Sequence, residues 1–134
     1  MLKPLNILTT ILFIGIFFNS RAQEHLKHEK WTALLTKYVD VEGHVNYAGF
    51  KKDETALDEY LAVLSANHPQ DTWDKDDILA FWINAYNAFT VKLIVKNYPV
   101  KSIKELGGAI YKVNTAWDIK FIKIGDEVYD LNNI

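Results

Sequence analysis

The segment from Ile78 to Val95, ILAFWINAYNAFTVKLIV, decides the fold of this chain. Its uncharged part runs for 14 residues before Lys92, which is short for a membrane-spanning helix and usual for a buried core helix. It has no wide polar face, so it does not fit a helix that lies on the protein surface. The acidic stretch 71–77 suits the start of a helix, and Tyr98-Pro99 suits its end. The sequence therefore predicts a helix over 74–97 that is buried on most sides.

Two asparagines lie within this helix, three residues apart. Their side chains are separated by about 60° around the axis and stand among small residues, so another backbone can approach this face closely. A buried amide without a hydrogen-bond partner costs about 1–3 kcal/mol, so each must be paired. Either the amides satisfy backbone groups of a neighbouring loop, or they line a pocket and orient a ligand or a catalytic group. The residues expected at such a pocket are Asn84, Asn87, Tyr86, Trp82 and Tyr47.

Two shorter helices and a hairpin are predicted before the central helix. Apolar residues at helical spacing indicate one helix over 26–38 and another that starts at an Asp53 N-cap and ends before Pro69. Between these helices, apolar and polar residues alternate over 39–47 around Gly43, which predicts a small β-hairpin.

A short helix and a second hairpin are predicted after the central helix. Ser102 and Glu105 form an S-x-x-E capping box, and Gly107-Gly108 closes the helix that it starts. Residues 109–116 are expected to be loop, and a hairpin follows that turns at Gly125-Asp126. The fold class is therefore α+β, a helical core around a long central buried helix with two small β-hairpins.

The length of the central helix raises the question of what covers it. A helix of about 24 residues spans roughly 36 Å. A compact domain of about 100 residues has a diameter of roughly 34 Å, so the helix would cross the whole protein. The other predicted elements are too few to cover it on all sides. We therefore expect a broken helix, an incomplete domain or a partner, and we expect the isolated chain to be poorly stable or to self-associate.

The first 22 residues resemble a signal peptide. Lys3 supplies the positive charge, and 7–18 form an apolar run of the required length. Small residues at Ser20 and Ala22 suit cleavage after Ala22. We expect residues 23–134 to form part of a single domain that is exported to the periplasm or secreted, with no membrane contact after cleavage.

Composition excludes several kinds of chemistry. The chain has no cysteine, which excludes disulfides, zinc–thiolate sites and a thiol nucleophile within it. Its net charge of −2 leaves no excess positive charge for nucleic acid. His25-x-x-His28 lacks a third ligand nearby, so we expect no metal site there. Neither Ser65 nor Ser102 has a G-x-S-x-G context, and no glycine-rich phosphate loop exists. No cofactor is expected.

Several motifs in a fixed order cover most of 31–134 and together resemble a known family. They are Trp31…Leu34-Leu35…Tyr38-Val39, Gly43-x-Val45-x-Tyr47, LAFWINAYNAF over 79–89, Tyr98-Pro99-Val100-x-Ser102-Ile103, and the segment 125–134. This series resembles the family called domain of unknown function 547. The string LAFWINAYNAF is the most specific of these motifs.

The resemblance implies that the domain continues past residue 134, with a histidine and a pair of cysteines in its later part. The family has no settled activity. Two functions are therefore expected. The first is a binding or scaffolding module for an unknown ligand or protein, with its pocket near Asn84 and Asn87. The alternative is a hydrolase or transferase whose nucleophile lies in the later half of the domain, to which this chain contributes supporting residues.

Overall fold

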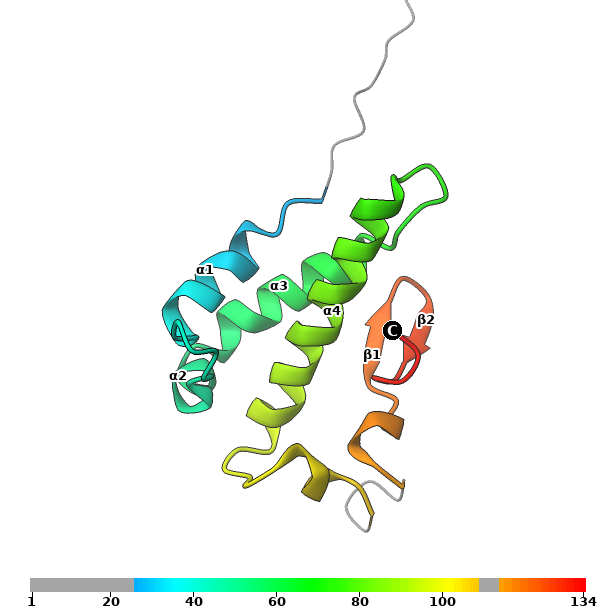
Figure 1. The fold of residues 1–134 in the computed structure, drawn as a ribbon. Coiled ribbons are helices and arrows are strands. Elements are labelled where there is room, and N and C mark those ends of the chain that lie inside the picture. Colours follow the sequence, from blue (N-terminus) through cyan, green and yellow to red (C-terminus); the bar gives the residue numbers. More distant parts are fainter. Residues whose placement is uncertain (1–25, 109–113) are drawn as a thin grey trace, which may run out of the picture.

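A computed structural model of the chain describes residues 26–108 and 114–134. The fold class is α+β, as the sequence predicts, with four α-helices and one small antiparallel sheet in this part of the chain (Figure 1). The predicted signal peptide and His25 lie outside the described residues. The elements are α1 (Glu29–Tyr38), α2 (Tyr47–Lys52), α3 (Glu54–Ala66), α4 (Lys75–Lys96), β1 (Ile122–Ile124) and β2 (Glu127–Tyr129), with 3-10 helices at Ile103–Leu106 and Ala116–Asp118.

The core forms where α3 and α4 cross (Figure 1). Ala85 and Ala88 are fully buried, and their small side chains let the two helices approach closely. One cluster of buried side chains joins all the helices to β1. Its large, fully buried members include Trp31, Phe50, Leu57, Tyr60, Leu64, Phe81, Leu93 and Ile122.

The central helix is not covered equally along its length. In its last turns Val91, Leu93, Ile94 and Val95 are all buried, so the chain surrounds this half on most sides as expected. In the first half Leu79, Ala80, Ile83 and Asn87 are exposed, so one face of the helix is open to solvent. By length and composition α4 could cross a membrane, and 44% of its most apolar stretch is buried inside the protein.

The first predicted hairpin forms in reduced form, as a turn at Gly43 without regular strands. Only one isolated bridge, Val39 with Val45, forms there, and the chain then enters helix α2. The Asn46 side chain caps this helix by accepting a hydrogen bond from the Gly49 N–H at 2.8 Å. Phe50 is fully buried, so the short helix is held by its packing against the core.

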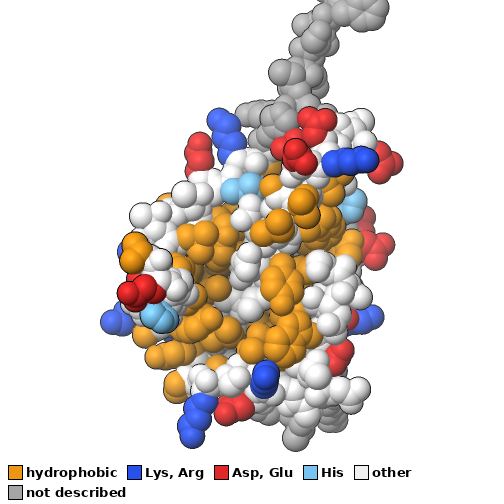
Figure 2. All heavy atoms as spheres, in the orientation of Figure 1, with side chains coloured by type: hydrophobic (Ala, Val, Ile, Leu, Met, Phe, Trp, Pro, Cys, Tyr) orange, Lys and Arg blue, Asp and Glu red, His pale blue; other side chains and the backbone are white. Residues whose placement is uncertain are grey.

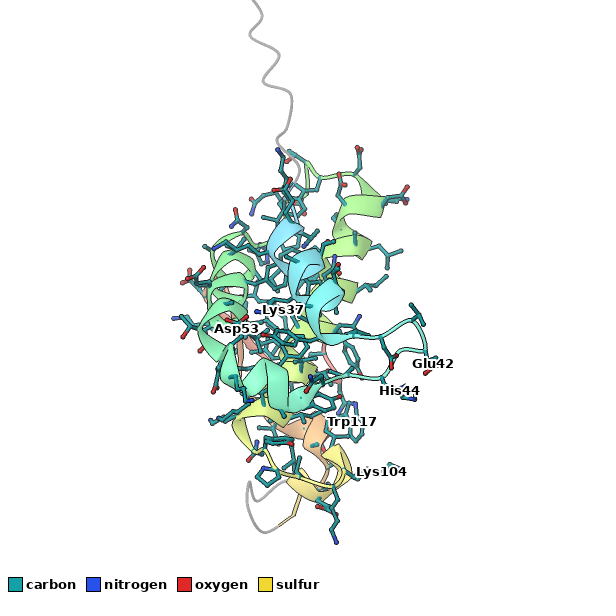
Figure 3. All side chains as sticks on the ribbon, turned by 90° about the vertical axis from the view of Figure 1, so that its left-hand side faces the viewer. Lys37, Glu42, His44, Asp53, Lys104 and Trp117 are labelled. Atoms are coloured by element: carbon teal, nitrogen blue, oxygen red, sulfur yellow. The ribbon has the colours of Figure 1, made fainter. Side chains whose placement is uncertain are left out.

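Asp53 occupies the N-cap position of α3, but its side chain does not cap the helix. The carboxylate instead accepts hydrogen bonds from Lys37 Nζ and Tyr38 Oη, each at 2.9 Å. These bonds hold the pKa of Asp53 below its usual value, with the Lys37 ammonium as the main cause. Figure 3 shows Lys37 and Asp53 side by side. The residue expected to start a helix therefore ties α1 to α3.

The second predicted hairpin is confirmed as β1 and β2. Ile122 pairs with Tyr129, and the turn uses Gly125 at a positive φ of 60°. The Gly125 N–H donates to the Ser65 carbonyl at 2.8 Å, which fixes the hairpin to the end of α3. Part of the loop expected at 109–116 lies outside the described residues.

The two short 3-10 helices have different caps. Ser102 caps the first, because its Oγ accepts from the Lys104 N–H at 3.3 Å. At the start of the second helix, the Asp118 carboxylate accepts from both the N–H and the hydroxyl of Thr115.

Candidate binding site

Three of the five residues expected at a pocket lie together on one groove. Trp82, Tyr86 and Asn87 project from successive turns of α4 and line a hollow of about 280 Å³. We call this hollow the α4 groove. Its lining residues are Leu79, Trp82, Ile83, Tyr86, Asn87 and Ile134.

The floor of the α4 groove is aromatic and is fixed by the C-terminal segment. Trp117 donates its indole N–H to the Tyr86 hydroxyl at 3.1 Å. The Trp82 ring meets Tyr129 edge-on, with ring centroids 5.5 Å apart and an interplanar angle of 63°. Both rings on α4 therefore have a fixed orientation before any ligand arrives.

Leu79 and Ile83 form the exposed wall of the groove. Their exposed fractions are 59% and 51%, which is unusual for two large aliphatic residues one helical turn apart. Figure 2 shows apolar side chains gathered over this face of the protein, with charged side chains at its edges. A contiguous apolar surface with a polar rim is typical of an interaction site.

The two asparagines are in different situations. Asn87 is exposed, and its amide donates to the Ile83 carbonyl of the same helix at 2.9 Å. The expectation that a neighbouring loop pairs this amide is therefore wrong, because the α4 backbone itself accepts the bond. Asn84 is half-buried and is not among the residues that line the groove.

Tyr47 does not line the α4 groove either. It is the first residue of α2, half-buried against the core, and its burial raises the pKa of its phenol. No local sequence pattern shows where a six-residue helix packs.

One cluster that the sequence analysis did not single out could hold a cation. Asp40, Glu42 and His44 place one ligand atom each within 4.8 Å of one another, and all three residues are exposed. Figure 3 shows Glu42 and His44 at the tip of the turn before α2. The turn itself accounts for the cluster. Asp40 accepts from the N–H groups of Glu42 and His44, each at 2.9 Å, and its other oxygen lies 3.0 Å from His44 Nδ1.

The two described serines and His28 have structural roles. Ser65 Oγ donates to the Lys123 carbonyl, and Ser102 is a helix cap. His28 Nδ1 is joined to the buried Tyr60 hydroxyl at 2.7 Å. Within 26–108 and 114–134, no serine meets a histidine, so a Ser–His nucleophile is not assembled in this region. The alternative function, a hydrolase or transferase, places the nucleophile in the later half of the domain, so that alternative stays a prediction.

The comparisons with known proteins agree with the resemblance seen in the motifs. Residues 70–134 match the family model DUF547, described as a protein of unknown function. The matched segment contains α4, the C-terminal hairpin and the whole α4 groove. The motifs before residue 70 lie outside the match. Comparison with curated proteins and with solved structures found no match.

Proposed function

We propose that the protein is an exported binding module that holds an apolar segment of another polypeptide in the α4 groove. The observation that carries this proposal is the groove itself, which has a fixed aromatic floor and two exposed aliphatic residues on its wall. Aromatic residues at a desolvated centre supply most of the affinity in protein interfaces.

The polar groups around the groove suit a polypeptide better than a charged ligand. Asn87 supplies an exposed amide beside the apolar wall, and an amide can accept from or donate to a peptide group. The side chains that line the groove hold no ionisable group apart from the Tyr86 phenol. Its chemistry therefore favours apolar side chains with one or two hydrogen bonds to a backbone.

A fluorescent apolar probe, 8-anilinonaphthalene-1-sulfonate, tests the groove. We expect saturable binding to the folded protein, at a concentration where it is monomeric, and strong weakening by Ile83→Asp. Val128→Asp is the matched control, because Val128 is 53% exposed but does not line the groove. Equal effects of the two substitutions would argue against the α4 groove as the binding surface.

The exported location rests on the sequence of residues 1–22. Expression in a bacterial host, followed by mass analysis of the mature protein, tests it. We expect a chain that begins at Gln23 in the periplasmic or secreted fraction. An unprocessed chain that stays with the membrane would contradict this location.

A further inference from the structure

We propose that the occupant of the α4 groove is a second copy of this chain, bound through an antiparallel pair of α4 helices. This inference rests on the proposed function, because it names the partner of the same surface. In such a pair each copy contributes its own Leu79 and Ile83 to the groove of the other. The site is then complete only in the dimer.

The exposed stripe of α4 is placed for a twofold symmetric contact. Leu79, Ile83 and Asn87 follow one another at intervals of four residues, so they lie within about 80° of arc on one face. The last turns of α4 are buried by the chain itself, so the stripe that a partner can reach is centred on Ile83. A twofold axis near Ile83 brings Ile83 of one copy to Ile83 of the other, and Leu79 to Asn87, as a self-complementary interface requires.

The charges at the two ends of α4 have opposite signs. The end where α4 begins carries four aspartates and one lysine over 71–77. The end where it stops carries three lysines and one glutamate over 96–105. Nearly all of these side chains are exposed, and only Asp77 is half-buried. Antiparallel pairing puts the acidic end of each copy beside the basic end of the other, whereas parallel pairing would set like charges together.

The interior of the contact is suited to close approach. Ala80 is exposed beside the stripe, and its small side chain lets a second helix come near the α4 backbone. The wall residues of one copy then lie over Trp82 and Tyr86 of the other, so the aromatic floor loses its contact with water. The apolar face of Figure 2 would be covered by the partner, with the charged ends at the rim.

Sedimentation velocity over a wide range of protein concentration tests the dimer. We expect a monomer–dimer equilibrium whose dissociation constant rises about tenfold or more with Ile83→Asp. Val128→Asp is the control and should leave the equilibrium unchanged, since it adds the same charge to a similarly exposed aliphatic position. Both variants change exposed side chains, so circular dichroism should show native folding. The dissociation constant of the wild type should also rise with added salt.

Disulfide crosslinking tests the antiparallel register. The sequence has no native cysteine, so only the introduced cysteines can form a disulfide. We expect Ile83→Cys to form a crosslinked dimer by itself, and an oxidised mixture of Leu79→Cys and Asn87→Cys proteins to form more crosslinked dimer than either of those two variants alone. Val128→Cys mixed with any of these variants should crosslink only at the rate of random collisions in solution.

The outcomes separate this inference from the proposed function. A protein that stays monomeric yet binds the fluorescent probe in an Ile83-dependent way overturns the dimer and keeps the binding module. A dimer that Ile83→Asp does not weaken, or that crosslinks equally well through Val128→Cys, also overturns the α4 pairing. A monomer that does not bind the probe overturns both proposals.

Discussion

Gly49 shows how one atom can decide the packing of the N-terminal elements. A Cβ placed on this glycine would lie 2.6 Å from two ring atoms of Tyr38. The backbone of α2 therefore approaches the Tyr38 ring more closely than any residue with a side chain allows. The same ring packs on Phe50, with centroids 4.8 Å apart, and its hydroxyl donates to Asp53.

We expect Gly49→Ala to destabilise the protein by about 1–3 kcal/mol, because the Tyr38 ring must move out of its packed position. In an unconstrained helix the same change would stabilise by about 0.5–1 kcal/mol. Urea denaturation measures the difference. Ala48→Gly, at the exposed neighbouring position, is the control and should cost about 0.5–1 kcal/mol. If Gly49→Ala instead stabilises the protein, the Tyr38 ring can move without a loss of packing energy.

His28 gives the fold a dependence on pH. Its burial lowers the pKa of the imidazole below 6.5, and Nδ1 is joined to the hydroxyl of fully buried Tyr60. The unfolded chain then binds more protons than the folded chain just below pH 6.5, so this group's stability is present above that value and falls as the pH decreases. We expect His28→Asn to lose less stability than the wild type between about pH 7 and pH 5. Thermal melts at several pH values measure the stability of both proteins. If stability falls by the same amount in both as the pH decreases, His28 does not have this role.

Residue patterns predict the groove better than they predict the caps. Trp82, Tyr86 and Asn87 could be grouped from sequence because they share a helix, where spacing determines which side chains are neighbours. Tyr47 could not be placed, because its position depends on how α2 packs. Asp53 was correctly put at a helix start, but its carboxylate bonds to α1, which no local pattern reveals.

At the scale of the elements, a half-buried ion pair joins α3 to α4. Lys92 is 19% exposed, and its ammonium contacts the carboxylates of Glu54, at 2.8 Å, and Asp58. Burial opposes the charge on Lys92, yet the two carboxylates outweigh it and raise the pKa of the ammonium. The same contact lowers the pKa of Glu54.

We expect Lys92→Met to cost about 1–2 kcal/mol, since it removes charge-assisted hydrogen bonds and leaves two carboxylates close together. Lys30→Met is the control, because Lys30 pairs with Glu59 across exposed surface, with the side chains 54% and 59% exposed. An exposed pair should contribute less than about 0.5 kcal/mol. Equal losses for the two variants in urea denaturation would show that burial adds nothing to the α3–α4 pair.

Long periodic elements could be predicted from the sequence, and the short one could not. In α1, α3 and α4 the helical spacing of apolar residues extends over several turns, so these helices can be identified from their apolar faces. The six residues of α2 contain a glycine and too few apolar positions to show a period, and the alternation before them suggested a strand. The available signal was Asn46, which stands three residues before the N–H that it caps.

At the scale of the whole molecule, the sequence predicts that the chain cannot cover its central helix, and the first half of α4 does stay uncovered on one face. The apolar surface of Figure 2 lies over that helix. The helix is thus divided by function. Its last turns hold the core together, and its first turns offer the surface that we propose for binding.

The family match begins between α3 and α4, which raises the question of whether residues 70–134 can fold alone. The buried side of α4 contains Phe81, Ala85 and Ala88, and it packs on α3 and α2, which lie before residue 70. The hairpin is also fixed to α3, through the bond from Gly125 to Ser65. Without residues 26–69, the core side of α4 would face water along most of its length.

We therefore expect a 70–134 fragment and a 23–69 fragment each to lack near-ultraviolet circular dichroism and a cooperative thermal transition. Mixed in equal amounts, they should regain both signals, because the α3–α4 crossing can form between separate chains. Phe81→Asp in the longer fragment should prevent this recovery, whereas Val128→Asp should not, since Phe81 is fully buried and Val128 is exposed. A 70–134 fragment that melts cooperatively by itself would show that the matched segment is an independent folding unit.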